Sequence, residues 1–205
     1  MPKAGVTYGP RIPAPDYAEI DKQAAEEARE ALGLNLPPQN LMTMGADEVF
    51  DRSSRIVTQA NAELAMYLEE RDQALAHFWF YEPRRFLAQT AGLSYMGLRG
   101  AITKLVYGDK KHPLPDVESN EELVRIGEEL GVRRVKDAEE QLLNASKIVR
   151  AAHQHRKEAM PYMQQATLAL SKAPYNWTPE RMAEHAGVDR KLIYNMRTAA
   201  LKREA

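Results

Sequence analysis

Apolar residues recur at helical spacing over a first long stretch of the chain, residues 46–78. Val49, Ile56, Leu64 and Leu75 are separated there by charged residues, which places the apolar side chains along one stripe of a helix. No proline or glycine interrupts the stretch. The pattern therefore predicts one long helix with an apolar stripe.

A second long stretch, residues 134–170, shows the same pattern. Leu142, Ile148, Ala152 and Met163 are among its apolar positions. Pro161 lies inside the stretch, and proline removes one helical hydrogen bond and crowds the preceding turn. We therefore expect a second long helix with a kink or a break near residue 160.

The N-terminal part of the chain predicts an arm followed by a short acidic helix. Residues 1–15 contain four prolines and two glycines, so we expect an extended arm that is disordered by default. Asp16 is a suitable N-cap for a helix that runs to about Leu32. Gly33 should close that helix before a break at Pro37 and Pro38.

Between the two long stretches, residues 108–119 contain two prolines and are interpreted as a linker. Ser119 and Glu122 have the spacing of a capping box, which predicts a short helix ending at Gly131. These elements give an all-α fold with two long helices, each leading into a helical corner. The predicted segments are 1–42 (arm and short acidic helix), 43–108 (first long helix and corner), 109–119 (linker) and 120–205 (second long helix and corner).

Composition excludes several classes of protein. The 205 residues include no cysteine, so disulfides, thiolate catalysis and cysteine-based metal sites are excluded. No apolar run is long enough for a membrane span or a secretory signal, and we expect a cytoplasmic protein. His153 and His155 are two residues apart and cannot share one helix face, and no nucleophile or phosphate-loop motif is present. We predict no enzyme activity, no metal and no cofactor.

The net charge of −1 is an average over unlike segments. Residues 1–50 carry eight acidic and four basic side chains, whereas residues 81–111 carry six basic and two acidic ones. Residues 178–205 carry six basic and four acidic ones. The two basic segments are therefore the candidates for contact with nucleic acid.

The chain contains a weak internal repeat at an offset of 95 residues. Residues 63–104 align without a gap to residues 158–199, and eight of the 42 pairs are identical. Ala88 pairs with Ala183 and Gly92 with Gly187. The repeat thus relates the two basic segments to each other.

Residues 179–198 have the pattern of two helices joined by a tight turn. Thr178 can cap the first helix, and Pro179 suits its first position. Gly187 stands where the chain needs a positive φ, and Asp189 can cap the second helix. Its inward positions are then Val188, Ile193 and Met196.

This segment resembles the helix-turn-helix family, whose second helix lies in the major groove of DNA. The family pattern is a small residue, a glycine four positions later, and apolar residues one, six and nine positions beyond that glycine. Residues 84–103 repeat it with Ala88, Gly92, Leu93, Leu98 and Ala101, and Ser94 is the matching cap. Long charged helices that lead into such units also resemble regulators of actinobacterial plasmids, integrative elements and phages.

The resemblance implies that the protein binds double-stranded DNA as a transcriptional regulator or a maintenance factor of a mobile element. Arginine or lysine can donate to guanine, and asparagine can bind adenine through two hydrogen bonds. The expected contact residues of the C-terminal unit are Arg190, Lys191, Tyr194, Asn195 and Thr198. Those of the middle unit are Tyr95, Met96, Arg99 and Thr103, with Arg84, Arg85 and Lys104 on phosphates.

Two further questions stay open at this level. The same corners could bind protein instead of DNA, which would make the chain an interaction or structural module. The long helices could be homodimerisation surfaces, although we favour packing of one repeat against the other within the chain. The aromatic run Phe78-Trp79-Phe80-Tyr81 could stack on bases, but core packing is the favoured role.

Overall fold

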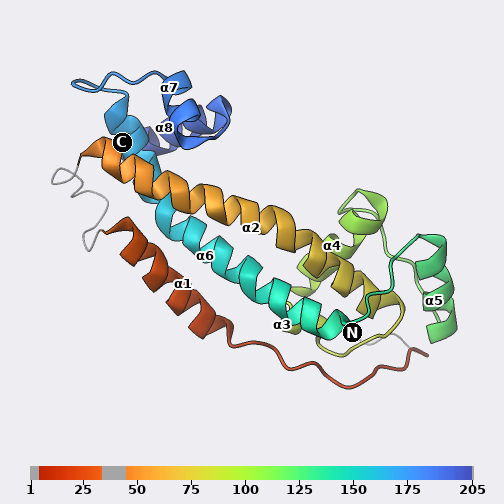
Figure 1. The fold of residues 1–205 in the computed structure, drawn as a ribbon. Coiled ribbons are helices and arrows are strands. Elements are labelled where there is room, and N and C mark those ends of the chain that lie inside the picture. The colour runs from red at the N-terminus through yellow and green to blue at the C-terminus, as the bar shows by residue number, and fades with distance from the viewer. Residues whose placement is uncertain (1–4, 34–44, 205) are drawn as a thin grey trace. The chain divides into compact units, whose positions relative to one another are not determined.

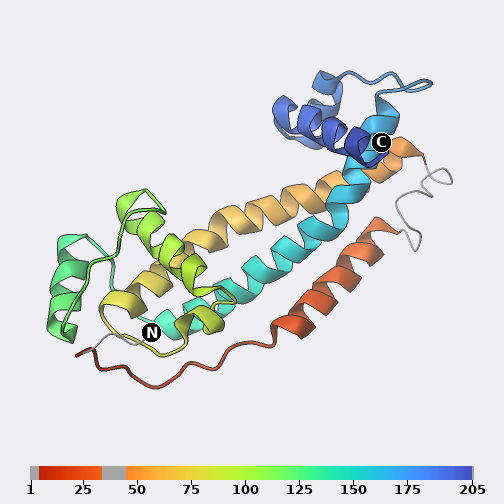
Figure 2. The same cartoon turned by 180° about the vertical axis from the view of Figure 1, so that it is seen from behind.

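The computed structural model describes residues 5–33 and 45–204, and eight α-helices make up the regular structure of this part (Figures 1 and 2). The all-α prediction is confirmed: within the described residues there is no strand, only one isolated bridge between Gly9 and Arg84. The helices are α1 (Tyr17–Leu32), α2 (Ala46–Phe80), α3 (Leu87–Thr90), α4 (Tyr95–Tyr107), α5 (Asn120–Glu129), α6 (Ala138–Leu170), α7 (Pro179–Ala186) and α8 (Arg190–Glu204).

The helix ends lie close to where the sequence puts them. Gly33 ends α1 with φ 65°, and its N–H donates to the carbonyls of Arg29 and Glu30. Ser119 caps α5 by accepting from the N–H of Glu122. The predicted break at Pro37 and Pro38 lies outside the described residues.

The expectation of a break near residue 160 is wrong, whereas a kink at this position stays a prediction. Helix α6 runs without interruption from Ala138 to Leu170, with Pro161 inside it. Proline lacks only one N–H donor, and the apolar residues on both sides of it hold the helix in place. Ala159 and Met163 are both fully buried.

The described chain forms two compact units that do not follow the order of the sequence. Unit 1 contains residues 5–17 and 65–150, and unit 2 contains residues 18–33, 45–64 and 151–204. Each unit combines the C-terminal part of one long helix, and the corner that follows it, with the N-terminal part of the other long helix. The predicted linker, residues 109–119, lies within unit 1, where Leu114 and Val117 are buried.

The core of unit 1 includes Phe78 and Phe80 from the end of α2, packed with Ile102 of α4 and Leu142 of α6. This confirms core packing for two residues of the aromatic run.

The N-terminal arm is ordered from residue 5 and extended across unit 1, so the expectation of disorder is wrong there. The N–H of Gly9 donates to the carbonyl of Pro83, and Thr7 exchanges two hydrogen bonds with the Asn120 side chain. Ile12 is only 2% exposed, and its carbonyl accepts from the Thr90 hydroxyl. Anchors of this kind are dispersed in the sequence and give no local signal.

Unit 2 has its own core, formed by Phe50, Met163, Met182 and Ile193 among others. Helix α1 lies beside the C-terminal part of α6 (Figures 1 and 2). Arg29 pairs with Glu158 at 3.1 Å, and Glu27 lies 3.1 Å from His155. These two contacts hold α1 against the C-terminal part of α6.

Candidate nucleic-acid interface

The corner between α7 and α8 forms where the sequence predicts it. The Thr178 hydroxyl accepts from the N–H of Arg181, and Pro179 opens α7. Gly187 has φ 63°, which turns the chain sharply after α7. The N–H of Val188 then donates to the carbonyl of Ala183 at 3.0 Å, closing the turn. Capping and the glycine turn together set the direction in which α8 leaves the corner.

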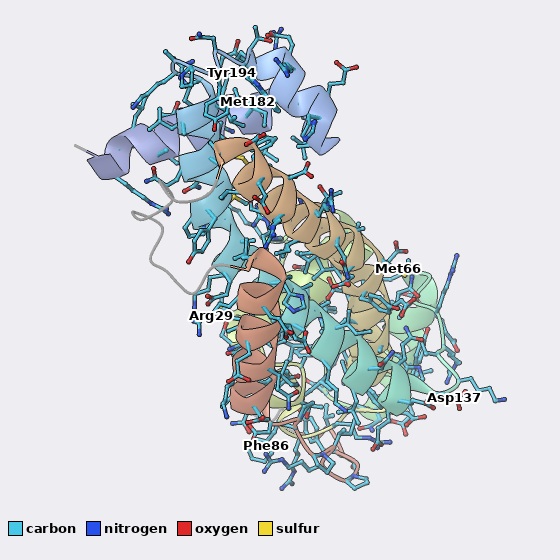
Figure 3. All side chains as sticks on the ribbon, turned by 60° about the vertical axis from the view of Figure 1, so that its left-hand side comes forward. Arg29, Met66, Phe86, Asp137, Met182 and Tyr194 are labelled. Carbon is cyan, nitrogen blue, oxygen red and sulfur yellow. The ribbon has the colours of Figure 1, made fainter. Side chains whose placement is uncertain are left out.

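Helix α8 separates a buried face from an exposed one. Ile193, Met196 and Ala200 are at most 2% exposed and belong to the inner face. The five predicted contact residues are all exposed. They are Arg190, Lys191, Tyr194, Asn195 and Thr198. One of them, Tyr194, is labelled on α8 in Figure 3, and it is 45% exposed.

Polar contacts order the start of α8. The Asp189 carboxylate accepts from the N–H of Lys191 at 2.6 Å, which confirms the predicted cap. A carboxylate at the position before a helix commonly accepts such a bond, so this cap is predictable from the sequence.

One residue of this surface, Glu180 of α7, was not predicted from the sequence. Arg190 pairs with Glu180 of α7 at 2.8 Å, and its guanidinium lies 5.8 Å from the centre of the Tyr194 ring. The pKa of Glu180 is lowered, first by a hydrogen bond from its own backbone N–H and then by bonds from Arg190 and Thr178. Glu180 is therefore ionised at neutral pH, and its carboxylate holds the Arg190 guanidinium in an ion pair. No local pattern links residues ten positions apart across a turn.

The corner between α3 and α4 repeats the same turn with a shorter first helix. Gly92 has φ 65°, and the N–H of Leu93 donates to the carbonyl of Ala88 at 2.8 Å. The Ser94 hydroxyl accepts from the N–H of Gly97 at 3.0 Å, as predicted for the cap. Buried Leu98 of α4 corresponds to Ile193 of α8 in the repeat. The internal repeat is thus visible in the local geometry of both corners.

The outward face of α4 differs from that of α8 in its chemistry. Met96 is 72% exposed and Tyr95 48%, while Lys104 is exposed and Arg99 half-buried. Thr103 was expected on this face, but it is 2% exposed. Its hydroxyl donates to the carbonyls of Gly100 and Lys110, because the segment after α4 folds back over this side of the helix. Thr103 is therefore not available for contact.

The two neighbouring arginines before α3 have different surroundings. The Arg84 side chain is only 19% exposed and pairs with Glu82 at 2.7 Å. Its guanidinium lies 5.5 Å from the centre of the Phe78 ring. Arg85 is exposed and has no ion-pair partner among the described residues. Arg85 fits the predicted phosphate contact, whereas Arg84 is already engaged within unit 1.

Residues 5–33 and 45–204 meet neither the requirements of a metal site nor those of a membrane-spanning helix. No group of three histidine, aspartate or glutamate side chains there is arranged to hold a metal ion. None of the helices in this part of the chain combines the length and apolar character that crossing a bilayer requires.

No protein-family model matches the chain, and comparisons with curated proteins and with solved structures find no significant similarity.

Proposed function

We propose that the protein binds double-stranded DNA with α8 in the major groove, as a transcriptional regulator or a maintenance factor of a mobile element. The observation that carries this proposal is the two-sided character of α8. Its inner face is buried, and its outer face presents Arg190, Lys191 and Asn195 beyond a tight glycine turn. A helix of this kind fits the width of the major groove of B-form DNA.

Three of the outward residues of α8 have roles that their chemistry supports. Arg190 or Lys191 donates to guanine O6 and N7, and Asn195 pairs with adenine through two hydrogen bonds. Arg190 must first leave Glu180, but an ion pair between side chains that are more than half exposed contributes little and is readily exchanged. In the corner of α3 and α4, Arg85 and Lys104 contact phosphates, which position the protein without reading sequence.

The experiment is selection of bound duplexes from a random pool, followed by mobility-shift assays on the selected sequence. The variant Arg190→Ala/Lys191→Ala should bind more than about tenfold more weakly, because each good base contact contributes about 1–3 kcal/mol of discrimination. The matched control is Lys22→Ala/Lys157→Ala, which removes two exposed positive charges from α1 and α6 of the same unit. Equal losses of DNA affinity in both variants would indicate a general effect of charge and would refute the assignment of α8 as the helix that contacts bases.

The corner of α3 and α4 has a second candidate function, contact with another protein. Met96 and Leu105 are exposed apolar residues on α4, in contrast to the polar outer face of α8. The substitution Met96→Glu should then abolish self-association or partner binding and leave the affinity for selected duplex DNA within about twofold. A loss of DNA affinity beyond the roughly 1–3 kcal/mol of one base contact would instead place α4 in a groove.

A further inference from the structure

Unit 1 contains a cavity of about 550 Å³ beneath the corner of α3 and α4. Its walls are mostly apolar and come from several separate parts of the chain. Val6 and Tyr8 belong to the N-terminal arm, Trp79 to the end of α2, Leu87 to α3 and Leu98 to α4. The volume is within the range of about 300–1,000 Å³ that is usual for sites of small organic ligands.

The rim of the cavity carries two large exposed aromatic rings. Phe86, the residue before α3, is 57% exposed (Figure 3), and Tyr95 at the start of α4 is 48% exposed. Phe86 also has a left-handed backbone, with φ 59°. A non-glycine residue in this conformation is uncommon and unfavourable, and such residues concentrate at ligand sites.

The charge at the rim is positive. Two arginines line the cavity, and the charge of Arg84 is balanced by Glu82. Arg85 has no carboxylate partner within the described residues, so its guanidinium can donate two parallel hydrogen bonds to an anion. Exposed rings, an apolar cavity and one unbalanced arginine are thus found together.

We propose that this cavity binds a small amphipathic anion, a compound with an aromatic or aliphatic body and one carboxylate or sulfonate group. The body lies among Trp79, Leu87 and Leu98, and the acidic group is bound by Arg85 at the rim. Phe86 and Tyr95 cover the body from the solvent side. The site shares Arg85 with the proposed phosphate contact of the same corner, but its test uses no DNA.

The experiment uses two fluorescent probes of similar shape on the full chain. Anilinonaphthalene sulfonate has an aromatic body and an anionic group, whereas N-phenylnaphthylamine is uncharged. Titration calorimetry of the wild type should give one site per chain for the anionic probe. Arg85→Gln should weaken that probe about five- to tenfold, since it removes a charge-assisted hydrogen bond that is partly exposed to solvent. The same variant should leave the uncharged probe within about twofold.

One further variant tests whether the position of the removed charge matters, and a second fills part of the cavity. Arg133→Gln removes an exposed arginine of unit 1 that does not line the cavity and should leave both probes unaffected. Val6→Trp adds a large side chain on the arm and should reduce the affinity for both probes at least tenfold. Far-UV circular dichroism verifies that each variant is folded, and if Val6→Trp does not fold, the comparison of Arg85→Gln with Arg133→Gln still decides the charge assignment.

The outcomes separate the proposal from its alternatives. Equal effects of Arg85→Gln and Arg133→Gln would overturn the anion assignment. Binding of several probe molecules per chain, unchanged by a folded Val6→Trp, would show a general apolar surface and overturn the site itself.

Discussion

The repeated glycine turns allow a paired test of how the two corners are built. Gly92 and Gly187 have nearly the same backbone conformation, with φ 65° and 63°. An L-residue in this region costs about 1–2 kcal/mol relative to the right-handed region. Alanine also restricts the unfolded chain, which offsets about 0.4–1 kcal/mol of that cost. Gly187→Ala should therefore lower the free energy of unfolding by about 1 kcal/mol, since a Cβ there would meet no atom within 4 Å.

Gly92→Ala should cost more, because a Cβ at this position would lie only 3.0–3.2 Å from the ring of Tyr17. The Tyr17 hydroxyl donates to the carbonyl of Thr90 at 2.6 Å, so the ring cannot move away without weakening that bond. A typical hydrogen bond contributes about 1 kcal/mol net. The expected total loss for Gly92→Ala is thus about 2–3 kcal/mol.

Urea denaturation followed by far-UV circular dichroism measures both losses. The excess at Gly92 should disappear in a Tyr17→Ala background, giving a coupling energy of about 1 kcal/mol in a double-mutant cycle. Equal losses at the two glycines, or an excess that persists without the Tyr17 ring, would refute the reasoning.

Three other predictions follow from single positions. Gly100→Ala should stabilise the chain by about 0.5–1 kcal/mol in urea denaturation, because Gly100 lies inside α4 and a Cβ there would meet nothing within 4 Å; a loss of stability would contradict this. Burial lowers the pKa of His77, whose Nδ1 lies 3.0 Å from the N–H of Val135, so the folded state resists protonation. Stability should be complete above about pH 6.5, the ordinary histidine value, and fall as the pH drops below it, and His77→Gln should flatten this part of the profile of unfolding free energy against pH. Glu180→Gln should release Arg190 and raise the affinity for selected duplex DNA up to about fivefold in mobility shifts, with no change if the ion pair is irrelevant to binding.

The parts of the fold that depend on short-range signals could be predicted from the sequence. The caps at Ser94, Ser119 and Thr178 form as expected, because each depends on a hydroxyl and an N–H three residues away. Gly92 and Gly187 adopt positive φ for a similarly local reason.

The parts that depend on long-range packing could not be predicted. The arm is ordered by contacts with residues more than 70 positions away, such as the bond from Thr90 to the Ile12 carbonyl. Thr103 is buried because the segment after α4 folds back over it, although its partner in the repeat, Thr198, is exposed. Aligning the two repeats residue by residue cannot show that a following segment covers the helix in only one of them.

Whether α8 contacts DNA bases is tested most directly by photocrosslinking. A photoreactive amino acid at position 194, in place of the exposed Tyr194, is compared with the same amino acid in place of Glu26, which is exposed on α1. With a duplex selected from a random pool, we predict crosslinks to major-groove base edges from position 194 and none from position 26. The absence of crosslinks from position 194, or equal yields from both positions, would contradict the proposed contact.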